Sequence, residues 1–323
     1  MKYLTNLTTS PNIMNWFDND WNNIRRFLDK HQLDGAEFMV RKGSDIDKIS
    51  KNSVMGMHLD YWPIWLDFWQ GNTNALLKEF GCNENIEAFY GSTDRNILVD
   101  HYRREWELAQ RLEVEYGVFH VAHVNLTDTY TREFNYNDWD VMEAAIDLVN
   151  QAFGDKDTGI KLLFENLWWP GLKLTDAALA KEFLDRIHYP NKGFMLDIGH
   201  MMITNPDIRD EEEACAYILS NLDDLQGLTK YIKGIHLNKS LSGEYLQGDF
   251  SKDIDMVNGK EDFWEKLQYI KGHISNIDNH VPFDHPAIKK VIDRVQPEYL
   301  VMELLTNNLQ ELDHMLSAQR KVL

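Results

Sequence analysis

The chain has 323 residues, of which 43% are hydrophobic, and its formal net charge is −19 at pH 7. This length fits two ordinary domains or one large barrel, and the apolar content is ample for a sizeable core. The negative charge argues against a general nucleic-acid or anionic-membrane surface, because both require a basic face. Two cysteines, Cys82 and Cys215, make neither a disulfide framework nor a metal-type cluster.

The N-terminal residues contain no basic stretch followed by a long apolar run. No later window approaches the length that spans a membrane. Together with the cysteine usage, this pattern leads us to expect a soluble cytoplasmic protein with no membrane partner.

Eight short apolar runs, each bounded by polar residues, are predicted to be buried strands. In chain order they are Lys2–Leu7, Gly35–Val40, Val54–Leu59, Gly117–Val124, Lys161–Asn166, Gly193–Ile198, Ile232–Leu237 and Tyr299–Leu304. Helix-like segments lie between or after them, namely Trp21–His31, Ile97–Tyr116, Trp139–Phe153, Asp176–Ile187, Asp210–Leu222, Lys260–Ile270, Pro286–Val295 and Leu309–Leu323. Only the connection Ser44–Asn52 is too short and polar to indicate a helix.

This eightfold alternation predicts an α/β fold, a (β/α)8 TIM barrel in a single domain over residues 1–323. A doubly wound open sheet is the competitor, but the first predicted strand is not followed by a Gly-rich phosphate turn. The longest irregular stretch is Lys239–Asn258. We expect an insert around residues 239–277 near the mouth of the barrel, where it would form a lid or wall of the site.

Four acidic or imidazole side chains stand at the carboxyl ends of four predicted strands: Glu165, Asp197, His236 and Glu303. A buried carboxylate is costly unless it is paired or bound to a metal, and all strands of a barrel end at one mouth. We therefore predict a divalent metal site there. One His with three carboxylates suits Mn²⁺, Mg²⁺ or Co²⁺ at least as well as Zn²⁺. The alternative is that each of the four groups is only a polar side chain at a strand end, with its own hydrogen-bond partners.

Further imidazole and carboxylate groups fall where they could extend this site, as metal ligands or as substrate contacts. They are His58, His120, His123, His200, Asp278 and His280. His120 and His123 have opposite parity along one strand, so only one of them is expected to face the site. A single His at such a position is more often a satisfied core residue, and the signal lies in the cluster.

Aromatic residues follow the same strand ends, and aromatic faces can stack on a sugar and exclude water. Trp62 follows the third predicted strand, and Trp168 and Trp169 follow the fifth. We predict that these residues and Lys239 line a substrate pocket, with loop packing as the alternative. Arg132 and Lys173 are candidates for a phosphate contact only through their loop positions.

The order of these residues resembles that of the xylose isomerase-like TIM barrel superfamily. This group includes sugar and sugar-phosphate isomerases and epimerases, and also the family 2 AP endonucleases. The resemblance extends from Gly35 to Glu303, and its clearest motifs are Asp-Ile-Gly-His at residues 197–200 and Asp-Asn-His at residues 278–280. Single motifs are short, whereas their order and placement on strands are fairly specific.

The resemblance to ketose 3-epimerases implies one divalent metal held by Glu165, Asp197, His236 and Glu303, with both glutamates transferring protons and His200 contacting substrate. The resemblance to AP endonucleases implies three zinc ions. The nine matching ligands would be His58, His120, Glu165, Asp197, His200, His236, Asp278, His280 and Glu303. Two departures exist. The segment after His236 lacks the epimerase Arg and offers only Lys239, and the interval to Asp278 is longer than in the endonuclease pattern.

Our leading hypothesis from the sequence is a metal-dependent sugar or sugar-phosphate isomerase or epimerase that works through an enediolate. Glu165 and Glu303 would be the acid/base pair. The alternative is a two- or three-ion phosphodiesterase or AP endonuclease-like hydrolase, for which the acidic surface disfavours DNA. A non-catalytic sugar-binding barrel is a third hypothesis. We expect a small carbohydrate substrate, and the resemblance also allows a homo-oligomer.

Overall fold

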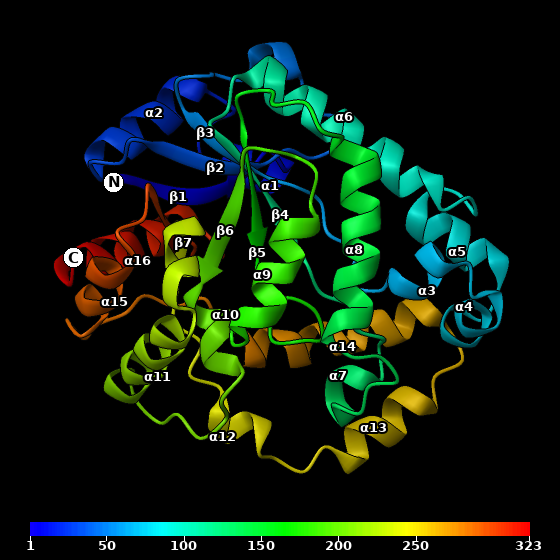
Figure 1. Cartoon of the computed structure of the whole chain (residues 1–323). Coiled ribbons are helices and arrows are strands. Elements are labelled where there is room, and N and C mark those ends of the chain that lie inside the picture. Colours follow the sequence, from blue (N-terminus) through cyan, green and yellow to red (C-terminus); the bar gives the residue numbers. More distant parts are fainter.

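The computed structural model describes all 323 residues and contains one closed barrel of eight parallel strands. Neighbouring strands pair in chain order, and β8 pairs back onto β1 (Figure 1). The strands are β1 Lys2–Thr8, β2 Gly35–Met39, β3 Val54–His58, β4 Tyr116–His120, β5 Lys161–Glu165, β6 Lys192–Asp197, β7 Ile232–Leu237 and β8 Tyr299–Met302. The predicted (β/α)8 barrel is confirmed.

Two strands end earlier than predicted by more than one residue. β4 stops at His120 rather than at Val124, and β8 stops at Met302, so that Glu303 is the first residue beyond it. The residues after His120 are nevertheless buried, because Ala122 forms an isolated antiparallel bridge with Gly171 above the barrel. Continuous burial keeps the sequence apolar past the end of the strand, and hydropathy alone therefore could not locate that end.

Helices and 3₁₀ turns connect the strands. They are α1 Pro11–Asn15, α2 Trp21–Lys30, η1 Ile46–Lys48, α3 Leu66–Gln70, α4 Thr73–Phe80, α5 Asn83–Tyr90, α6 Asn96–Leu112, α7 Asp128–Thr131, α8 Asp138–Phe153, α9 Ala177–Arg186, α10 Ile198–Ile203, α11 Glu211–Asp224, η2 Gln226–Tyr231, α12 Gly243–Leu246, α13 Ser251–Asn258, α14 Phe263–Ile277, α15 Ile288–Val295 and α16 Leu309–Lys321. β2 and β3 are joined by the short η1 alone, as the polar stretch indicated. Asn137 and Asp176 cap α8 and α9 with side-chain oxygens that accept backbone N–H groups.

The segment Lys239–Asn258 is not irregular as predicted, because it contains α12 and α13. These helices are one or two turns long, and Leu246 and Val257 are the large apolar side chains that they bury. Helices this short are not stable by propensity. Both pack against α14, which places the three helices as one wall beside the mouth. Tertiary packing that the local sequence does not show therefore decides their conformation.

The core has two layers. Apolar residues on the outward faces of the strands pack against the helices, and a smaller set fills the inside of the barrel. Tyr116 and Tyr299 lie within the inner set, with ring centroids 4.4 Å apart. A Cβ at Gly56 would lie 2.2 Å from the Tyr116 ring, so only glycine permits this close approach. The amino-terminal half of the barrel is thereby plugged with side chains.

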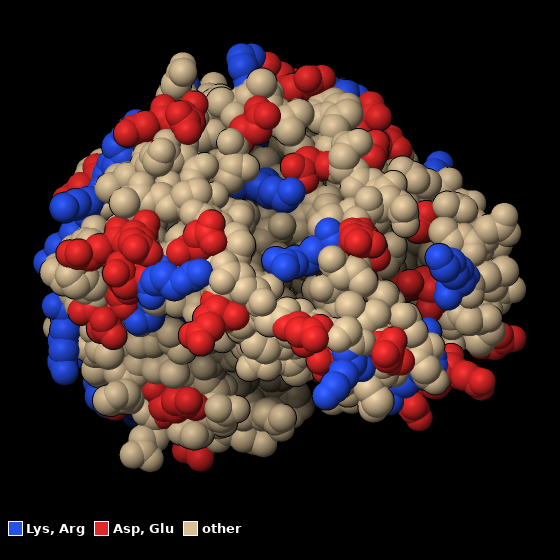
Figure 2. Space-filling model, turned by 90° about the horizontal axis from the view of Figure 1, so that it is seen from below, with Lys and Arg blue, Asp and Glu red and all other residues tan.

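The strand arrows in Figure 1 point toward the lower end of the molecule, where α7, α10, α12, α13 and α14 gather. Figure 2 looks onto that end and shows acidic and basic side chains interspersed, without a continuous basic surface. None of the helices combines the length and apolar character that crossing a membrane requires.

Candidate metal centre

The structure brings Glu165, Asp197, His236 and Glu303 together at the carboxyl end of the barrel. The Nδ1 atom of His236 lies 3.2 Å from a carboxylate oxygen of Glu165, 3.2 Å from one of Glu303 and 3.8 Å from one of Asp197. Glu165, Asp197 and His236 are completely buried, and the Glu303 side chain is 13% exposed. Four donor atoms thus face one point from four different strand ends.

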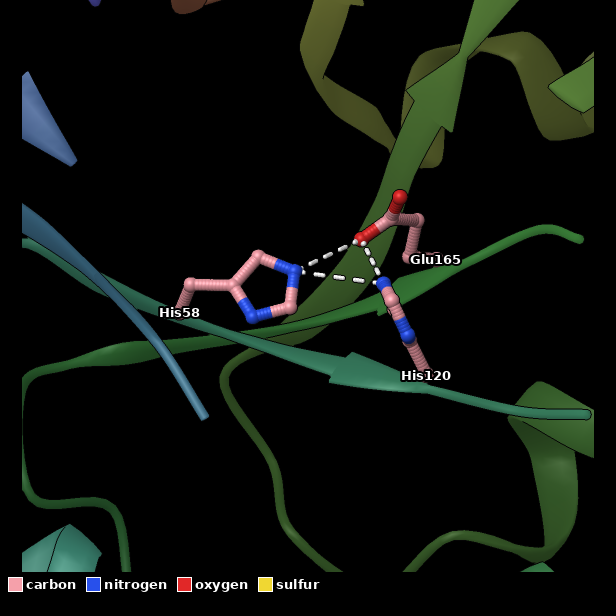
Figure 3. A group of neighbouring side chains, drawn as sticks. All are labelled: His58, His120 and Glu165. Atoms are coloured by element: carbon pink, nitrogen blue, oxygen red, sulfur yellow. Dashed lines mark hydrogen bonds and ion pairs between the residues drawn. The ribbon is translucent and has the colours of Figure 1, made fainter. Parts of the chain in front are cut away.

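A second group shares the carboxylate of Glu165. His58, the last residue of β3, and His120, the last of β4, point their Nε2 atoms at its other oxygen from 3.3 and 2.7 Å (Figure 3). The two Nε2 atoms are only 3.1 Å apart. Lone pairs at that separation repel one another unless a proton or a metal ion lies between them.

A third group is formed by His200, Asp278 and His280. Both imidazoles point their Nε2 atoms at the same oxygen of Asp278, from 3.3 and 2.8 Å. His200 lies in α10, and Asp278 directly follows α14. His280 adopts the left-handed φ of 46°, which is unusual for a residue other than glycine. The observed strain, in a loop that reaches the centre, is typical of functional positions.

The imidazoles are held in one orientation by their second nitrogens. The Nδ1–H groups of His58, His200 and His280 donate to the backbone carbonyls of Leu59, Asn166 and Glu303 at 2.9, 2.9 and 3.1 Å. Each Nε2 then faces the centre, where it offers a lone pair to a metal ion once its proton has left. Metal-binding histidines are typically fixed in this way, because an acceptor on one nitrogen sets the tautomer and strengthens the other as a ligand.

Glu37 of β2 performs the same task for His236, and the sequence interpretation missed it. Its two oxygens accept from His236 Nε2 at 3.1 and 3.2 Å, which leaves Nδ1 free to face the other carboxylates. Glu37 is 1% exposed. The available signal was an acidic residue inside the apolar run Gly35–Met39, where an unpaired carboxylate would be costly.

Asp197 is positioned by a network of amides. One of its oxygens accepts the backbone N–H of His200 at 2.6 Å, and the other accepts from the Asn238 side chain at 2.8 Å. Asn166 bonds both the N–H and the C=O of Asp197 through its side chain. Burial raises the pKa of Asp197 to about 7.

Imidazolium partners lower the pKa values of Glu165, Asp278 and Glu303 and so hold these three carboxyl groups ionised. Burial alone would lower the pKa of His58, but the Glu165 carboxylate, 3.3 Å away, outweighs burial and raises the pKa to about 9. Burial opposes ionisation of Glu303, yet His236 holds the pKa of Glu303 well below its usual range. In the protein alone, the positive charges that neutralise these carboxylates are thus the protons bound by the imidazoles.

The residues fit divalent metal ions. Both oxygens of Glu165, Nδ1 of His236 and one oxygen of Glu303 are buried without a hydrogen-bond partner in the protein. Orphaned buried polar atoms are rare and require an explanation. Imidazole nitrogen combined with carboxylate oxygen suits Zn²⁺, Mn²⁺ or Co²⁺.

Three predicted site residues lie elsewhere. His123 Nδ1 accepts the N–H groups of Trp65 and Leu66 at 3.1 and 3.3 Å, where α3 begins, and burial lowers the His123 pKa to about 3. Trp62 packs edge-on against His101 and Tyr102. Lys239 pairs with Glu211 and Asp284. The structure does not bring these three side chains to the centre.

Trp168 does lie beside the centre, with its ring centroid 5.1 Å from that of His200 and 4.5 Å from that of Trp169. Tyr61 lies 4.6 Å from His120 in the same measure. These rings line a cavity of about 490 Å³ that reaches His120. Of the loop cations, Lys173 is paired with Asp138 at 2.8 Å, and Arg132 donates to the Leu246 carbonyl at 3.0 Å.

Residues 85–317 match the family model of the xylose isomerase-like TIM barrel. The chain belongs to this family. Endonuclease IV from Thermus thermophilus has a similar structure, with 13% identity, coverage of 100% of this chain and 98% of that chain, and a TM-score of 0.53. D-psicose 3-epimerase in the presence of D-fructose is also similar, with 12% identity, coverage of 100% and 96%, and a TM-score of 0.52.

A third similar structure is the apo form of a 3-keto-D-glucoside 4-epimerase from E. coli, with 13% identity, coverage of 99% of each chain and a TM-score of 0.50. No curated protein sequence shows a significant match to the chain. At these identities the likenesses establish the fold. The similar structures include both epimerases and an endonuclease, so the reaction has to be inferred from the site.

Proposed function

We propose that the protein is a metal-dependent hydrolase of phosphate esters that uses two or three divalent ions. The observation that carries this proposal is the environment of Glu165. One of its oxygens faces the Nε2 atoms of His58 and His120, and the other faces the Nδ1 atom of His236. A carboxylate with ligand groups on both sides is suited to bridge two ions, and it leaves neither oxygen free to move a proton at carbon.

Charge supports more than one ion. Glu37, Glu165, Asp197, Asp278 and Glu303 together bring five carboxylates to a largely buried centre. With neutral imidazoles and ionised carboxylates, one dication leaves a net charge of −3, whereas two or three give −1 or +1. Buried net charge is strongly unfavourable. Two or three ions therefore come closest to neutrality.

The first ion would be held by His58, His120 and Glu165. A second would be held by Glu165, Asp197, His236 and Glu303, and a third by His200, Asp278 and His280. When bound, such ions supply Lewis acidity toward a phosphoryl group and toward water. In the hydrolysis, the oxygen of water bonds to phosphorus, the ester P–O bond breaks, and the departing oxygen gains a proton.

The protein's own groups position this chemistry. Glu303 and Asp278 are the two carboxylates that stay partly exposed at the centre, and Glu303, beside His236, can accept the proton that water releases. The barrel plug limits bulk water below the centre, and the Trp168 and Trp169 rings limit it on the side of His200. A small ester fits better than DNA, because the face around the mouth carries no continuous basic surface (Figure 2).

A sugar isomerase or epimerase is the second candidate, and one observation favours it. Glu165 and Glu303 flank Nδ1 of His236 at 3.2 Å each, so they could stand on two faces of a substrate carbon with a single ion between them. Such an enzyme would use Glu165 and Glu303 as its acid/base pair. It would give no chemical role to His58, His120, Asp278 and His280.

The test combines metal content with two assays. Protein purified without chelator should contain two or three ions per chain by plasma mass spectrometry, and it should hydrolyse bis(p-nitrophenyl) phosphate. Glu165→Gln should lose at least one ion per chain and about 10²-fold or more of the rate, as removal of one stabilising group does elsewhere. Glu298→Gln, at the opposite end of the barrel, should change neither.

One ion per chain, together with exchange of deuterium from D₂O into a carbon of free or phosphorylated ketoses in NMR spectra, would contradict the hydrolase and support the epimerase. Absence of both activities in a metal-loaded protein would contradict both and leave the non-catalytic sugar-binding barrel.

A further inference from the structure

Two separate cavities reach the metal centre. The first, called here the α14 cavity, has a volume of about 490 Å³ and is lined by Trp168, Trp169, Ile270 and Ile274. It touches the centre through His120, His200 and Asp278. Its walls are therefore mainly aromatic and aliphatic, and its one lysine, Lys271, is solvent-exposed.

The second, called here the α1 cavity, has a volume of about 300 Å³. Ile13, Trp16 and Leu305 are among its apolar walls, and it touches the centre through Glu37, His58 and Glu303. Its one basic residue, Arg41, is paired with Asp60 at 3.3 Å. Leu305 is 58% exposed, so its side chain stands at the open rim of this cavity.

The ligands themselves form the boundary between the two cavities. His58 lines the α1 cavity and His120 lines the α14 cavity, yet their Nε2 atoms are 3.1 Å apart. The α1 cavity follows β1, β2 and β8, whereas the α14 cavity follows β4 and β5 on the other side of the closed barrel. A group bound over the ligands therefore has space on both sides.

We infer that the substrate has two arms, with a ring-sized apolar group in the α14 cavity and a second apolar group in the α1 cavity. The inference rests on the proposed function, and it identifies the ester as a diester with an uncharged substituent on each side of the phosphoryl group. Each cavity exceeds the volume of about 150 Å³ that accepts benzene in an engineered protein core. Neither cavity offers an unpaired buried cation for a second phosphate.

Non-hydrolysable phosphinates test the inference without any turnover. Dimethylphosphinate, methylphenylphosphinate and diphenylphosphinate carry the same charge and the same pair of oxygens, but no ring, one ring and two rings. Their affinities for the metal-loaded protein would be measured by calorimetry. We expect affinity to increase by about tenfold or more at each step, because each ring buries apolar surface.

Single substitutions assign each step to one cavity. Ile274→Asp should abolish the gain from one of the two rings, and Leu305→Asp, at an exposed position that the fold tolerates, should abolish the gain from the other. Gln268→Asp is the matched control, because Gln268 is exposed on α14 and lines neither cavity. It should change no affinity. Ile274→Thr replaces Ile274→Asp if melting shows that the aspartate variant is unfolded.

Equal affinities across the series, or no measurable binding of any phosphinate, would overturn the inference. An increase in affinity at only one step of the series would contradict a substrate with two arms and would support one apolar arm. Two steps in a protein that hydrolyses no phosphate ester would keep the two cavities as subsites and refute the proposed reaction alone. The two proposals can therefore fail independently.

Discussion

The two ends of the barrel handle charge in opposite ways. At the amino-terminal end, Glu115 contacts Lys2 and accepts from the Tyr299 hydroxyl at 3.0 Å, and Glu298 pairs with Lys161 at 3.1 Å and with Lys233 at 3.5 Å. Both carboxylates have a basic partner from the protein, and the Glu298 side chain remains 45% exposed.

At the carboxyl end, the five carboxylates of the centre are surrounded by imidazoles and amides, with no lysine or arginine among their close partners. The same sheet thus ends in a rim whose charges are paired within the protein and, under the proposed function, in a centre that would bind added cations. Residues at the first rim contribute little to stability individually, since exposed ion pairs contribute about 0–1 kcal/mol. The contribution of the carboxyl-terminal centre to the free energy of unfolding depends on what the centre binds.

Removal of metal should therefore produce the largest effect. An ion present at about 100 times its Kd adds about 2.7 kcal/mol to the free energy of unfolding. For a chain of this size, a chelator should lower the melting temperature by about 4 °C for each such ion that it removes, and re-addition of Zn²⁺ or Mn²⁺ should restore it. Glu298→Gln should leave this chelator-dependent shift unchanged. Identical melting curves with and without chelator would contradict the idea that the carboxyl end, unlike the amino-terminal end, is stabilised by bound cations.

Two single variants, each with one of two nearby histidines replaced, should change metal content or stability by less than metal removal does. They test which side chains belong to the carboxyl-terminal centre. His120→Ala should reduce the metal content, since His120 faces Glu165. His123→Ala should retain all the metal but lower the unfolding free energy by about 1 kcal/mol, because two N–H groups at the start of α3 lose their acceptor. Metal content by mass spectrometry and urea unfolding separate the two outcomes. Loss of metal from His123→Ala would return this residue to the centre.

His101 provides the smallest predicted effect. It lies 3.2 Å from Asp60 and 3.3 Å from Glu105 on the outer side of the barrel. Burial lowers its pKa, but these carboxylates outweigh burial and raise the pKa to about 9. The folded pKa exceeds the unfolded value of about 6.5, so protonation contributes stability fully below pH 6.5, and this is lost as pH rises through 9.

For this partly exposed group we expect a contribution of about 1 kcal/mol or less. An NMR titration of the His101 ring should give a midpoint near 9 in the wild type and a lower midpoint in Asp60→Asn. A midpoint near 6.5 in the wild type would show that carboxylate neighbours alone do not protonate an imidazole in this protein.

The barrel and most of the centre were predictable from sequence because both depend on short local patterns. Each strand is a distinct apolar run, and parallel strands in a barrel must end at one mouth, so Glu165, Asp197 and His236 could be placed together from the sequence. Glu37 was missed because it is an isolated acid within such a run. Its partner, His236, is 199 residues away.

His123 and the wall formed by α12, α13 and α14 were not predictable for a different reason. Hydropathy does not show where β4 leaves the sheet, since the residues beyond it stay buried. The short helices depend on contacts with one another and with α7 rather than on their own sequence. The α14 cavity is walled by residues that such contacts place, and no sequence pattern indicated it.

The spread of the ligands around the barrel has a consequence for how the chain folds. The centre draws on residues from β2 to the loop after β8, and it is complete only when β8 has paired with β1. Contacts between residues so distant in sequence form slowly and late. Uptake of metal during refolding should therefore follow closure of the barrel, and a colourimetric zinc indicator could time the last event of folding directly.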